Sequence, residues 1–300
     1  MPIHLRRPVF RKIAVVLEMI KIEHTIFAMP FAFLGAFLAE RGVPGAAKAG
    51  WIALAMVGAR SAGMAFNRLV DLEYDRANPR TAGRALPQKL VSRGFVVLFI
   101  AVSTGVFAAA AAMADPLALR LSPIALAIMF FYSWTKRFTW SSHFFLGLVL
   151  ACAPIGAWVA IRGEIGATAL LLGLAVSLWV AGLDIIYACQ DVDFDRRVRL
   201  RSIPERFGVP AALWISGAAH AAMLAVLVWL FRSEGLGPIS LAGLGAVALL
   251  LAYEHSLVRP SDLSRVNTAF FTVNGWISIL LFATTSVDIL VLQSLTRTSP

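Results

Sequence analysis

Apolar runs of about 20 residues recur along this 300-residue sequence, and they constrain its fold more than any other feature. A helix of that length can cross the hydrocarbon core of a bilayer. The runs are continuous rather than alternating, and only helices or closed barrels satisfy the backbone in lipid, so we expect helices. Hydrophobic residues make up 59% of the chain and charged residues only 15%, against about a quarter in soluble domains. The sequence therefore predicts an all-α, polytopic membrane protein.

Nine such runs predict a bundle of helices joined by short loops. The expected spans are 22–40, 50–70, 94–113, 117–135, 142–161, 167–188, 210–231, 237–254 and 268–292. Together they form one transmembrane domain over residues 22–292, which a short tail over residues 293–300 follows. Residues 1–21 combine basic side chains with apolar ones at helical spacing, which predicts an amphipathic segment on the cytoplasmic membrane face.

Basic residues are distributed unequally between the two sides of this expected bundle. With the N-terminus in the cytoplasm, segments on that side hold 20 Lys and Arg residues, and segments on the other side hold 5. Cytoplasmic loops of membrane proteins are enriched in Lys and Arg, so the bias predicts the orientation. The formal net charge of +10 then reflects these loops rather than a nucleic-acid-binding module. We expect a multi-pass protein of the cell inner (plasma) membrane.

An Asn and two Asp recur at four-residue spacing where the second predicted span meets water. Asn67, Asp71 and Asp75 share one face of a helix, because residues four apart are neighbours there. Two carboxylates one turn apart favour a cation. Arginines that favour an anion are close by: Arg68, Arg76, Arg80 and Arg84. Such a segment is typical either of a solvated turn or of a site for a magnesium-bound diphosphate.

A second copy of the pattern favours the site over the turn. Asp191 and Asp195 again stand four residues apart at the end of the sixth predicted span, and a basic loop follows them. Two unrelated solvated turns with the same spacing and the same flanks are less expected than one duplicated function. The basic residues of this second loop are Arg196, Arg197, Arg199 and Arg201.

Both acidic patterns end spans on the predicted cytoplasmic side, so they can form one site if their helices adjoin. The expected Mg²⁺ ligands are Asn67, Asp71, Asp75, Asp191 and Asp195. Two turns deeper on the second helix, Asp184 lies on the same face as Asp191, with Tyr187 between them.

Arg60 is the most informative single residue. It precedes Asn67 by seven positions, so it lies on the same stripe and roughly 10 Å deeper in the membrane. A charge at that depth is costly and is usually functional. We interpret Arg60 as an anchor for an anionic substrate group, with a structural ion pair as the alternative. Tyr132, Lys136 and Arg137 end the fourth span on the same side, where the two cations could bind diphosphate.

Other sites are not indicated by the sequence. Cys152 and Cys189 lie in apolar surroundings and predict no disulfide. The five His are scattered without metal-ligand spacing, and neither a phosphate-binding loop nor a dinucleotide fingerprint is found. A transporter with an Asp/Arg relay is the alternative from another class. It would place charges near the middle of several spans, whereas here they gather at one side.

These motifs resemble those of the UbiA superfamily of intramembrane prenyltransferases, over nearly the whole chain. The resemblance rests on N-x-x-x-D-x-x-x-D at 67–75, Y-x-x-x-K at 132–136, D-x-x-Y-x-x-x-D-x-x-x-D at 184–195, and the loop at 78–87. Within that superfamily, the sequence most resembles the bacterial 4-hydroxybenzoate polyprenyltransferase-like proteins of quinone biosynthesis.

The resemblance implies Mg²⁺-dependent transfer of a polyprenyl group from its diphosphate to an aromatic acid, in ubiquinone or menaquinone biosynthesis. The chain has Glu23-His24-Thr25 where related 4-hydroxybenzoate enzymes carry a basic or Pro-containing segment. A dihydroxynaphthoate acceptor therefore stays open beside 4-hydroxybenzoate, as does another acceptor of the family, such as a haem- or chlorophyll-type one. The residues expected to bind substrate are Arg60, Arg68, Arg80, Arg84, Lys136, Arg137, Tyr187 and Arg196.

The expected mechanism is ionisation of the prenyl diphosphate, followed by attack of the electron-rich ring on the allylic cation. A carboxylate then removes the ring proton, and Asp191 is the residue that we assign to this step. Tyr132 and Lys136 are the other expected catalytic residues.

The charge bias predicts where reporters fused to the chain will be found. A reporter after Pro300 is expected outside the cytoplasm, because nine spans separate it from the cytoplasmic N-terminus. A reporter in the 196–206 loop is expected inside the cytoplasm. Alkaline phosphatase and fluorescent-protein fusions measure the two positions. Both reporters on one side would contradict the span count.

Overall fold

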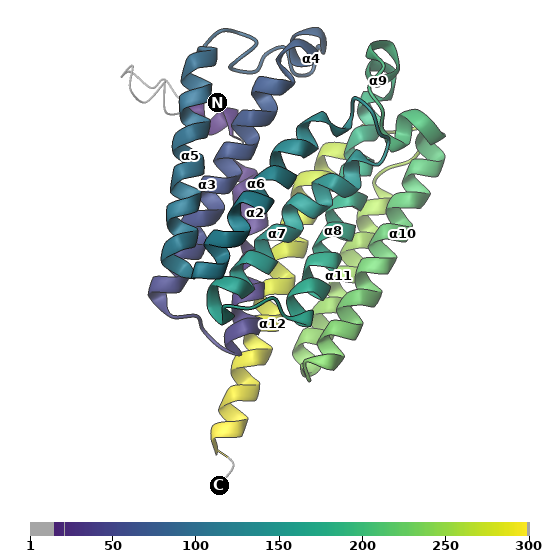
Figure 1. Ribbon diagram of the computed structural model, residues 1–300. Coiled ribbons are helices and arrows are strands. Elements are labelled where there is room, and N and C mark those ends of the chain that lie inside the picture. Colours follow the sequence, from purple (N-terminus) through teal and green to yellow (C-terminus); the bar gives the residue numbers. More distant parts are fainter. Residues whose placement is uncertain (1–14, 21, 299–300) are drawn as a thin grey trace, which may run out of the picture.

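The computed structural model describes residues 15–20 and 22–298, and within them the fold is helical. Long helices lie side by side in one bundle (Figure 1). Extended pairing in the described part is limited to an isolated bridge between Arg259 and Asp262. The predicted all-α class is confirmed.

The long helices coincide with the predicted spans. They are α2 (Ile22–Glu40), α3 (Ala46–Val70), α5 (Arg93–Ala114), α6 (Pro116–Thr135), α7 (Ser142–Arg162), α8 (Ala167–Ala188), α10 (Ile203–Ser233), α11 (Pro238–Ser256) and α12 (Asn274–Thr298). Short elements complete the described part: α4 (Leu72–Ala77), η1 (Cys189–Asp191), α9 (Val192–Val198) and the π-helical η2 (Thr268–Val273). Among the described residues, eight helices are long and apolar enough to cross a membrane, and α2 adds the shorter apolar stretch Ala28–Glu40.

The largest difference from the predicted bounds is at the start of α10. α10 starts at Ile203 rather than at position 210, because Ser202 caps it through a hydrogen bond from the Glu205 backbone N–H (3.2 Å). Gly208 then interrupts the helix with φ +82°, a conformation that favours glycine. The membrane-length part therefore follows the kink, where Pro210 stands.

Successive helices pack against one another in a closed arrangement. α3 packs on α5, α7 on α8 and α8 on α10, and α12 returns to contact α2. The main core joins α8 to the C-terminal helices and includes Leu172, Ile186 and Phe231. α8 is the most buried of the spans, so it is positioned by neighbours on both sides.

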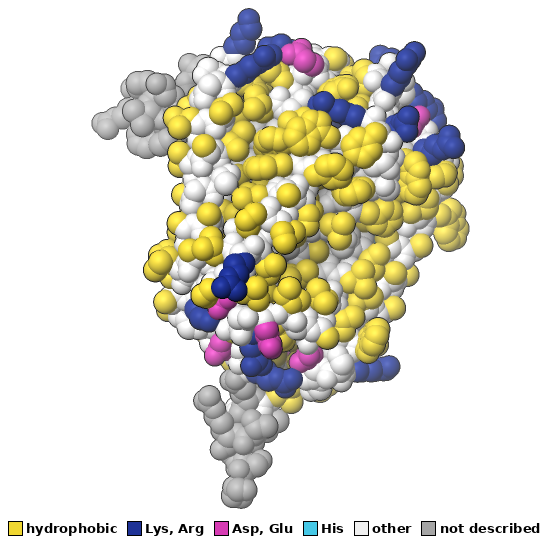
Figure 2. Space-filling model, in the orientation of Figure 1, with side chains coloured by type: hydrophobic (Ala, Val, Ile, Leu, Met, Phe, Trp, Pro, Cys, Tyr) yellow, Lys and Arg dark blue, Asp and Glu magenta, His cyan; other side chains and the backbone are white. Residues whose placement is uncertain are grey.

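The surface has the distribution expected of a protein in a bilayer. On the face in Figure 2, hydrophobic side chains cover the middle of the molecule, and charged side chains gather towards its two ends. In Figure 1, α4 and α9 lie at the same end of the bundle. The ends of the two acidic motifs thus lie on one side, as the sequence predicts.

Of the amphipathic segment expected over residues 1–21, only residues 15–20 are among those described. Met19 and Ile20 are buried there, in a cluster with Leu72 and Leu86. The remainder of that prediction lies outside the described residues.

A buried polar network joins three helices near the end that carries α4 and α9. The Trp179 indole N–H on α8 donates to Asn274 Oδ1 (2.7 Å), and Asn274 Nδ2 donates to Glu254 Oε1 on α11 (2.7 Å). Asn274 Nδ2 also donates to the carbonyl of Ala269 in η2 (3.0 Å). These bonds fix the start of α12 against α8 and α11.

Close approach of α7 and α8 depends on Gly147, and this generates a stability prediction. A Cβ at Gly147 would collide with the Ser177 carbonyl oxygen of α8, whereas a Cβ at Gly156 on the same helix meets nothing within 4 Å. Gly147→Ala should therefore destabilise the protein by about 1–3 kcal/mol, as overpacking does.

Thermal unfolding of the purified protein in detergent measures this effect. Gly156→Ala is the matched control, and it should be neutral or slightly stabilising because Ala is the better helix former. Equal unfolding midpoints for the two variants would show that the α7–α8 contact does not depend on Gly147.

Candidate functional site

The first acidic motif is built around a change of direction at the end of α3. Asp71 follows the last residue of α3 with φ −90° and ψ 9°, and α4 begins at the next residue. Asn67 Nδ2 donates to Asp71 Oδ2 (2.9 Å), and the Asp75 N–H donates to the Asp71 carbonyl (2.8 Å). The three side chains therefore stay on one side of the chain although the helix is not continuous.

The second motif has the same construction at the end of α8. The 3₁₀ turn η1 separates α8 from α9, and Asp191 stands at its end. Asp195 on α9 is buried and accepts a hydrogen bond from Ser202 Oγ (3.0 Å). Both motifs thus place one Asp at a helix break and a second, buried Asp one turn later.

The loop after α4 connects the two motifs through arginine side chains. Arg84 Nη1 lies 2.6 Å from Asp75 Oδ1 in the first motif. Arg80 binds both carboxylate oxygens of Asp191 in the second, at 3.0 Å (Nε) and 2.6 Å (Nη2). Arg80 also donates to the Tyr187 hydroxyl (3.1 Å). The loop therefore crosses from one helix end to the other and neutralises a carboxylate at each.

A third side of the site comes from the end of α6. Arg137 donates to the Val70 carbonyl (2.9 Å) and lies 3.6 Å from Asp71 Oδ1. Burial lowers the pKa of Lys136, but the Asp184 carboxylate and other nearby groups raise it, so its pKa lies above the ordinary value. Lys136 is thus a charged donor beside the acidic motifs.

In the first motif, the surroundings of Asp71 disfavour the ionised form of its carboxyl group. Burial raises the pKa of Asp71, and the nearby carboxylate of Asp75 raises it further. Asp75 Oδ2 is buried and has no hydrogen-bond partner among the described residues. A cation placed between these carboxylates would relieve both effects.

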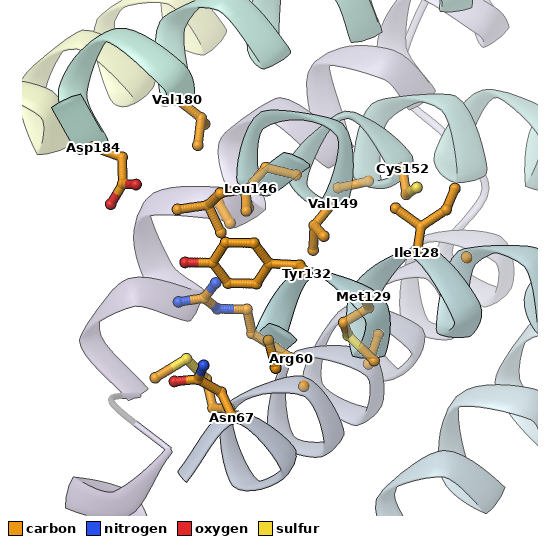
Figure 3. A pocket seen from close by; sticks show the side chains of 18 of the residues that line it. Arg60, Asn67, Ile128, Met129, Tyr132, Leu146, Val149, Cys152, Val180 and Asp184 are labelled. Carbon is orange, nitrogen blue, oxygen red and sulfur yellow. The ribbon is translucent and has the colours of Figure 1, made fainter. Parts of the chain in front are cut away.

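These groups surround one end of a cavity of about 1130 Å³. Away from the charged end, its walls are mostly apolar and come from α3, α5, α6, α7 and α8. Figure 3 shows the Tyr132 hydroxyl and the Arg60 guanidinium pointing to the side of the cavity where the Asp184 carboxylate lies. A polar head and a long apolar tail could both be accommodated.

The structure brings nearly all of the predicted site residues to this cavity. Those that line it are Arg60, Asn67, Arg68, Asp71, Asp75, Arg80, Arg84, Tyr132, Lys136, Arg137, Tyr187, Asp191 and Asp195. Arg196 is not brought there, because it is exposed on α9 and is absent from the lining.

Several contacts of the site carry no signal in the sequence. Asn78 Nδ2 lies 3.5 Å from Asp191 Oδ1, and the Tyr74 ring lies under Arg137 at 5.4 Å. His143 bonds Asp184 from another helix, 41 residues away in the sequence. Local spacing indicates none of these contacts, since each partner comes from a different element.

Among the described residues, no group of three or more His, Cys, Asp or Glu side chains is close enough to hold a metal ion in the present arrangement. Arginines occupy the carboxylates instead, as at Asp75 and Asp191. The oxygen donors, the unpartnered Asp75 Oδ2 and the crowded Asp71 nevertheless suit a hard cation, provided that the guanidinium groups turn away.

Comparison with known proteins gives one consistent result. The profile of the UbiA prenyltransferase family matches residues 28–278. The chain is 31% identical over 256 residues to a 4-hydroxybenzoate octaprenyltransferase of Alkalilimnicola ehrlichii, which covers 85% of this chain and 86% of the relative. A protein with the same description from Vibrio atlanticus is 32% identical over 222 residues, covering 74% and 78%.

Solved structures share the fold. The apo structure of a UbiA homologue from Aeropyrum pernix has a TM-score of 0.81 and 39% identity, covering 89% of this chain and 98% of that one. A UbiA homologue from Archaeoglobus fulgidus, bound to DMAPP and Mg²⁺, has a TM-score of 0.70 at 19% identity, covering 92% and 99%. The second likeness concerns the fold alone.

Proposed function

This chain belongs to the UbiA prenyltransferase family, and we propose that it transfers a polyprenyl group from its diphosphate to an aromatic acid of the 4-hydroxybenzoate type. The observation that carries the proposal is the junction of two acidic motifs, the basic loop after the first motif, the cations at the end of α6 and an apolar cavity in one site. The step would belong to ubiquinone or menaquinone biosynthesis, with a dihydroxynaphthoate as the alternative acceptor.

Mg²⁺ is the proposed cofactor. Asn67, Asp71, Asp75, Asp191 and Asp195 supply the oxygen atoms that would hold it. The ion would neutralise charge on the departing diphosphate. Support comes from the unpartnered oxygen of Asp75 and from the crowding of Asp71 by Asp75.

The diphosphate would lie among the basic residues of the same end. Arg80 and Arg84 now hold Asp191 and Asp75, so both must turn from carboxylate to phosphate when the substrate binds. Lys136 and Arg137 approach from the end of α6, and Arg68 from α3. Arg196, which the sequence adds to this set, would need α9 to move.

Arg60 is proposed to bind the carboxylate of the aromatic acid. No ion pair of Arg60 is found within the described part of the chain, and its buried Nε has no hydrogen-bond partner. A structural ion pair, the alternative explanation for this arginine, is therefore unsupported. Its guanidinium lines the cavity beside Tyr132, two turns below Asn67.

We propose that the reaction site opens on the cytoplasmic side of the inner membrane. The basic loops that hold the acidic motifs are also the loops that the charge bias predicts to be inside. The prenyl diphosphate could then enter with its tail in the apolar part of the cavity and its head at the membrane surface.

Product analysis tests the reaction and its metal requirement together. Purified protein with a polyprenyl diphosphate and 4-hydroxybenzoate should form prenylated acid only with Mg²⁺, should stop with EDTA, and should recover when Mg²⁺ returns. A panel of dihydroxynaphthoates in the same assay identifies the acceptor. Full activity after thorough metal depletion would remove Mg²⁺ from the proposal.

The carboxylates of both motifs should be needed for transfer. Asp71→Asn and Asp195→Asn keep shape and an oxygen but remove charge, so each is expected to lower turnover by about 100-fold or more. Glu73→Gln and Asp193→Asn are matched controls, because both residues are exposed neighbours outside the cavity lining. Wild-type turnover in either Asp variant, measured with folded protein, would sink the metal assignment.

Arg60→Lys should weaken acceptor binding far more than prenyl diphosphate binding. A guanidinium matches a carboxylate through two hydrogen bonds, and Lys cannot reproduce that geometry. Loss of a charge-assisted bond costs about 2 kcal/mol, or some 30-fold in the KM for the acid. An acceptor analogue without the carboxylate should be almost unaffected.

Steady-state kinetics of both substrates, with the analogue alongside, measure this difference. An equal loss for the prenyl diphosphate, or for the analogue, would place the acceptor elsewhere in the cavity.

A further inference from the structure

One buried pair beside the cavity has no role in the scheme above. His143, in the first turn of α7, is fully buried, and its Nδ1 lies 2.6 Å from Asp184 Oδ2 on α8. Asp184 lines the cavity and is only 8% exposed. A bond this short between a ring nitrogen and a carboxylate is charge-assisted.

The second ring nitrogen of His143 determines where its proton lies. Nε2 is 3.3 Å from the backbone N of Ile203, at the start of α10. Because a backbone N–H can only donate, Nε2 must accept, and the ring proton is therefore on Nδ1. His143 is a neutral donor to Asp184, and Asp184 receives the bond as a carboxylate.

The same turn of α10 also holds the second acidic motif. Ser202, directly before Ile203, donates to Asp195 Oδ2 (3.0 Å). The start of α10 thus fixes Asp195 directly and Asp184 through His143. The start of α10 therefore positions both Asp195, near the end of the bundle, and Asp184, deeper in the cavity.

Asp184 and Arg60 both lie deeper than the helix breaks of their motifs. Asp184 precedes the break at Asp191 by seven positions, and Arg60 precedes the break at Asp71 by eleven, so Arg60 lies about one turn deeper. Figure 3 shows both side chains, with the Tyr132 hydroxyl, directed to one region of the cavity. An aromatic acid with its carboxylate on Arg60 would extend its ring towards Asp184.

Asp191, by contrast, is engaged in both states, because both of its oxygens bind Arg80 here and it would hold Mg²⁺ once Arg80 turns to the diphosphate. Asp184 Oδ1 has no hydrogen-bond partner among the described residues and is free for a substrate. We propose that Asp184 removes the ring proton and that His143 is a positioning residue, which fixes Asp184 Oδ2 and leaves Oδ1 towards the cavity.

This inference rests on the proposed function. The C–O bond to diphosphate breaks with both electrons on oxygen, and a π pair of the ring forms the new C–C bond. The ring C–H then gives its proton to Asp184 Oδ1, and the C–H electrons restore aromaticity. Asp184 becomes a neutral acid and later releases the proton to water.

Ring deuteration distinguishes proton removal from a structural role. The full-length protein in lipid nanodiscs would be given Mg²⁺, a polyprenyl diphosphate, and 4-hydroxybenzoate with hydrogen or deuterium ortho to its hydroxyl. Asp184→Asn keeps the shape and the acceptor for His143, and it should lower kcat by about 100-fold or more, with a primary isotope effect larger than that of wild type.

His143 is tested with two substitutions. His143→Leu removes the donor and should lower kcat by about tenfold, again with a raised isotope effect and a smaller change in the KM for the prenyl diphosphate. His143→Asn places an N–H near the position of Nδ1 and should restore most of kcat and the wild-type isotope effect. A residue that only joins helices would change protein yield without changing the isotope effect.

Asp191→Asn is the comparison that decides between the two bases. If Asp191 is only a metal ligand, Asp191→Asn should lower turnover without increasing the isotope effect, because ionisation of the diphosphate would then limit the rate. An increase in Asp191→Asn but not in Asp184→Asn would overturn the inference and leave the prenyltransfer intact. Absence of product from the wild type with every acid tested would overturn the proposed function itself, and this inference with it.

Discussion

A carboxylate that is removed from water needs a cation beside it, and in this bundle such buried carboxylates lie at the ends of α3 and α8. Asp75 and Asp191 come from different halves of the chain, and Arg84 and Arg80 of one loop neutralise them. The ion pairs hold the loop across the mouth of the cavity. The same pairing makes the site responsive, because a metal–diphosphate complex offers the carboxylates a cation and the arginines an anion at once.

Charged groups at different depths in the cavity suit different parts of the proposed substrates. Near the membrane surface, the acidic motifs and basic loops suit the diphosphate. Deeper in the bundle, Asp184 on α8 and Arg60 on α3 face the cavity, and the walls beyond them are largely apolar. A charge at this depth is expensive in lipid, and both groups face the cavity rather than the bilayer. The arrangement matches an amphiphile with a charged head, a reacting centre beside an aromatic acid, and a long tail.

Much of this could be predicted from the sequence, since continuous apolar runs and four-residue spacing are local signals. The helical membrane fold and the prediction of an enzyme rather than a transporter are confirmed, and the residues of both motifs line one cavity. Of the nine predicted spans, eight correspond to described helices of membrane length, and α2 supplies a shorter apolar stretch. Contacts between distant elements could not be predicted. His143 reaches Asp184 across 41 positions, and the Trp179–Asn274–Glu254 network joins three helices without any repeated spacing. The sequence predicts Arg196 at the site because it follows Asp195, but on α9 it is exposed and does not line the cavity.

The central claim is that the ends of α3 and α8 act as one metal–diphosphate site, and electron paramagnetic resonance can test it directly. Mn²⁺ would replace Mg²⁺ in the purified protein, with a non-hydrolysable prenyl diphosphate analogue. The account predicts a bound Mn²⁺ with phosphorus hyperfine coupling in the wild type, and loss of that signal in both Asp71→Asn and Asp195→Asn. A full signal in either variant would show that the two helix ends do not share the site and would contradict the account.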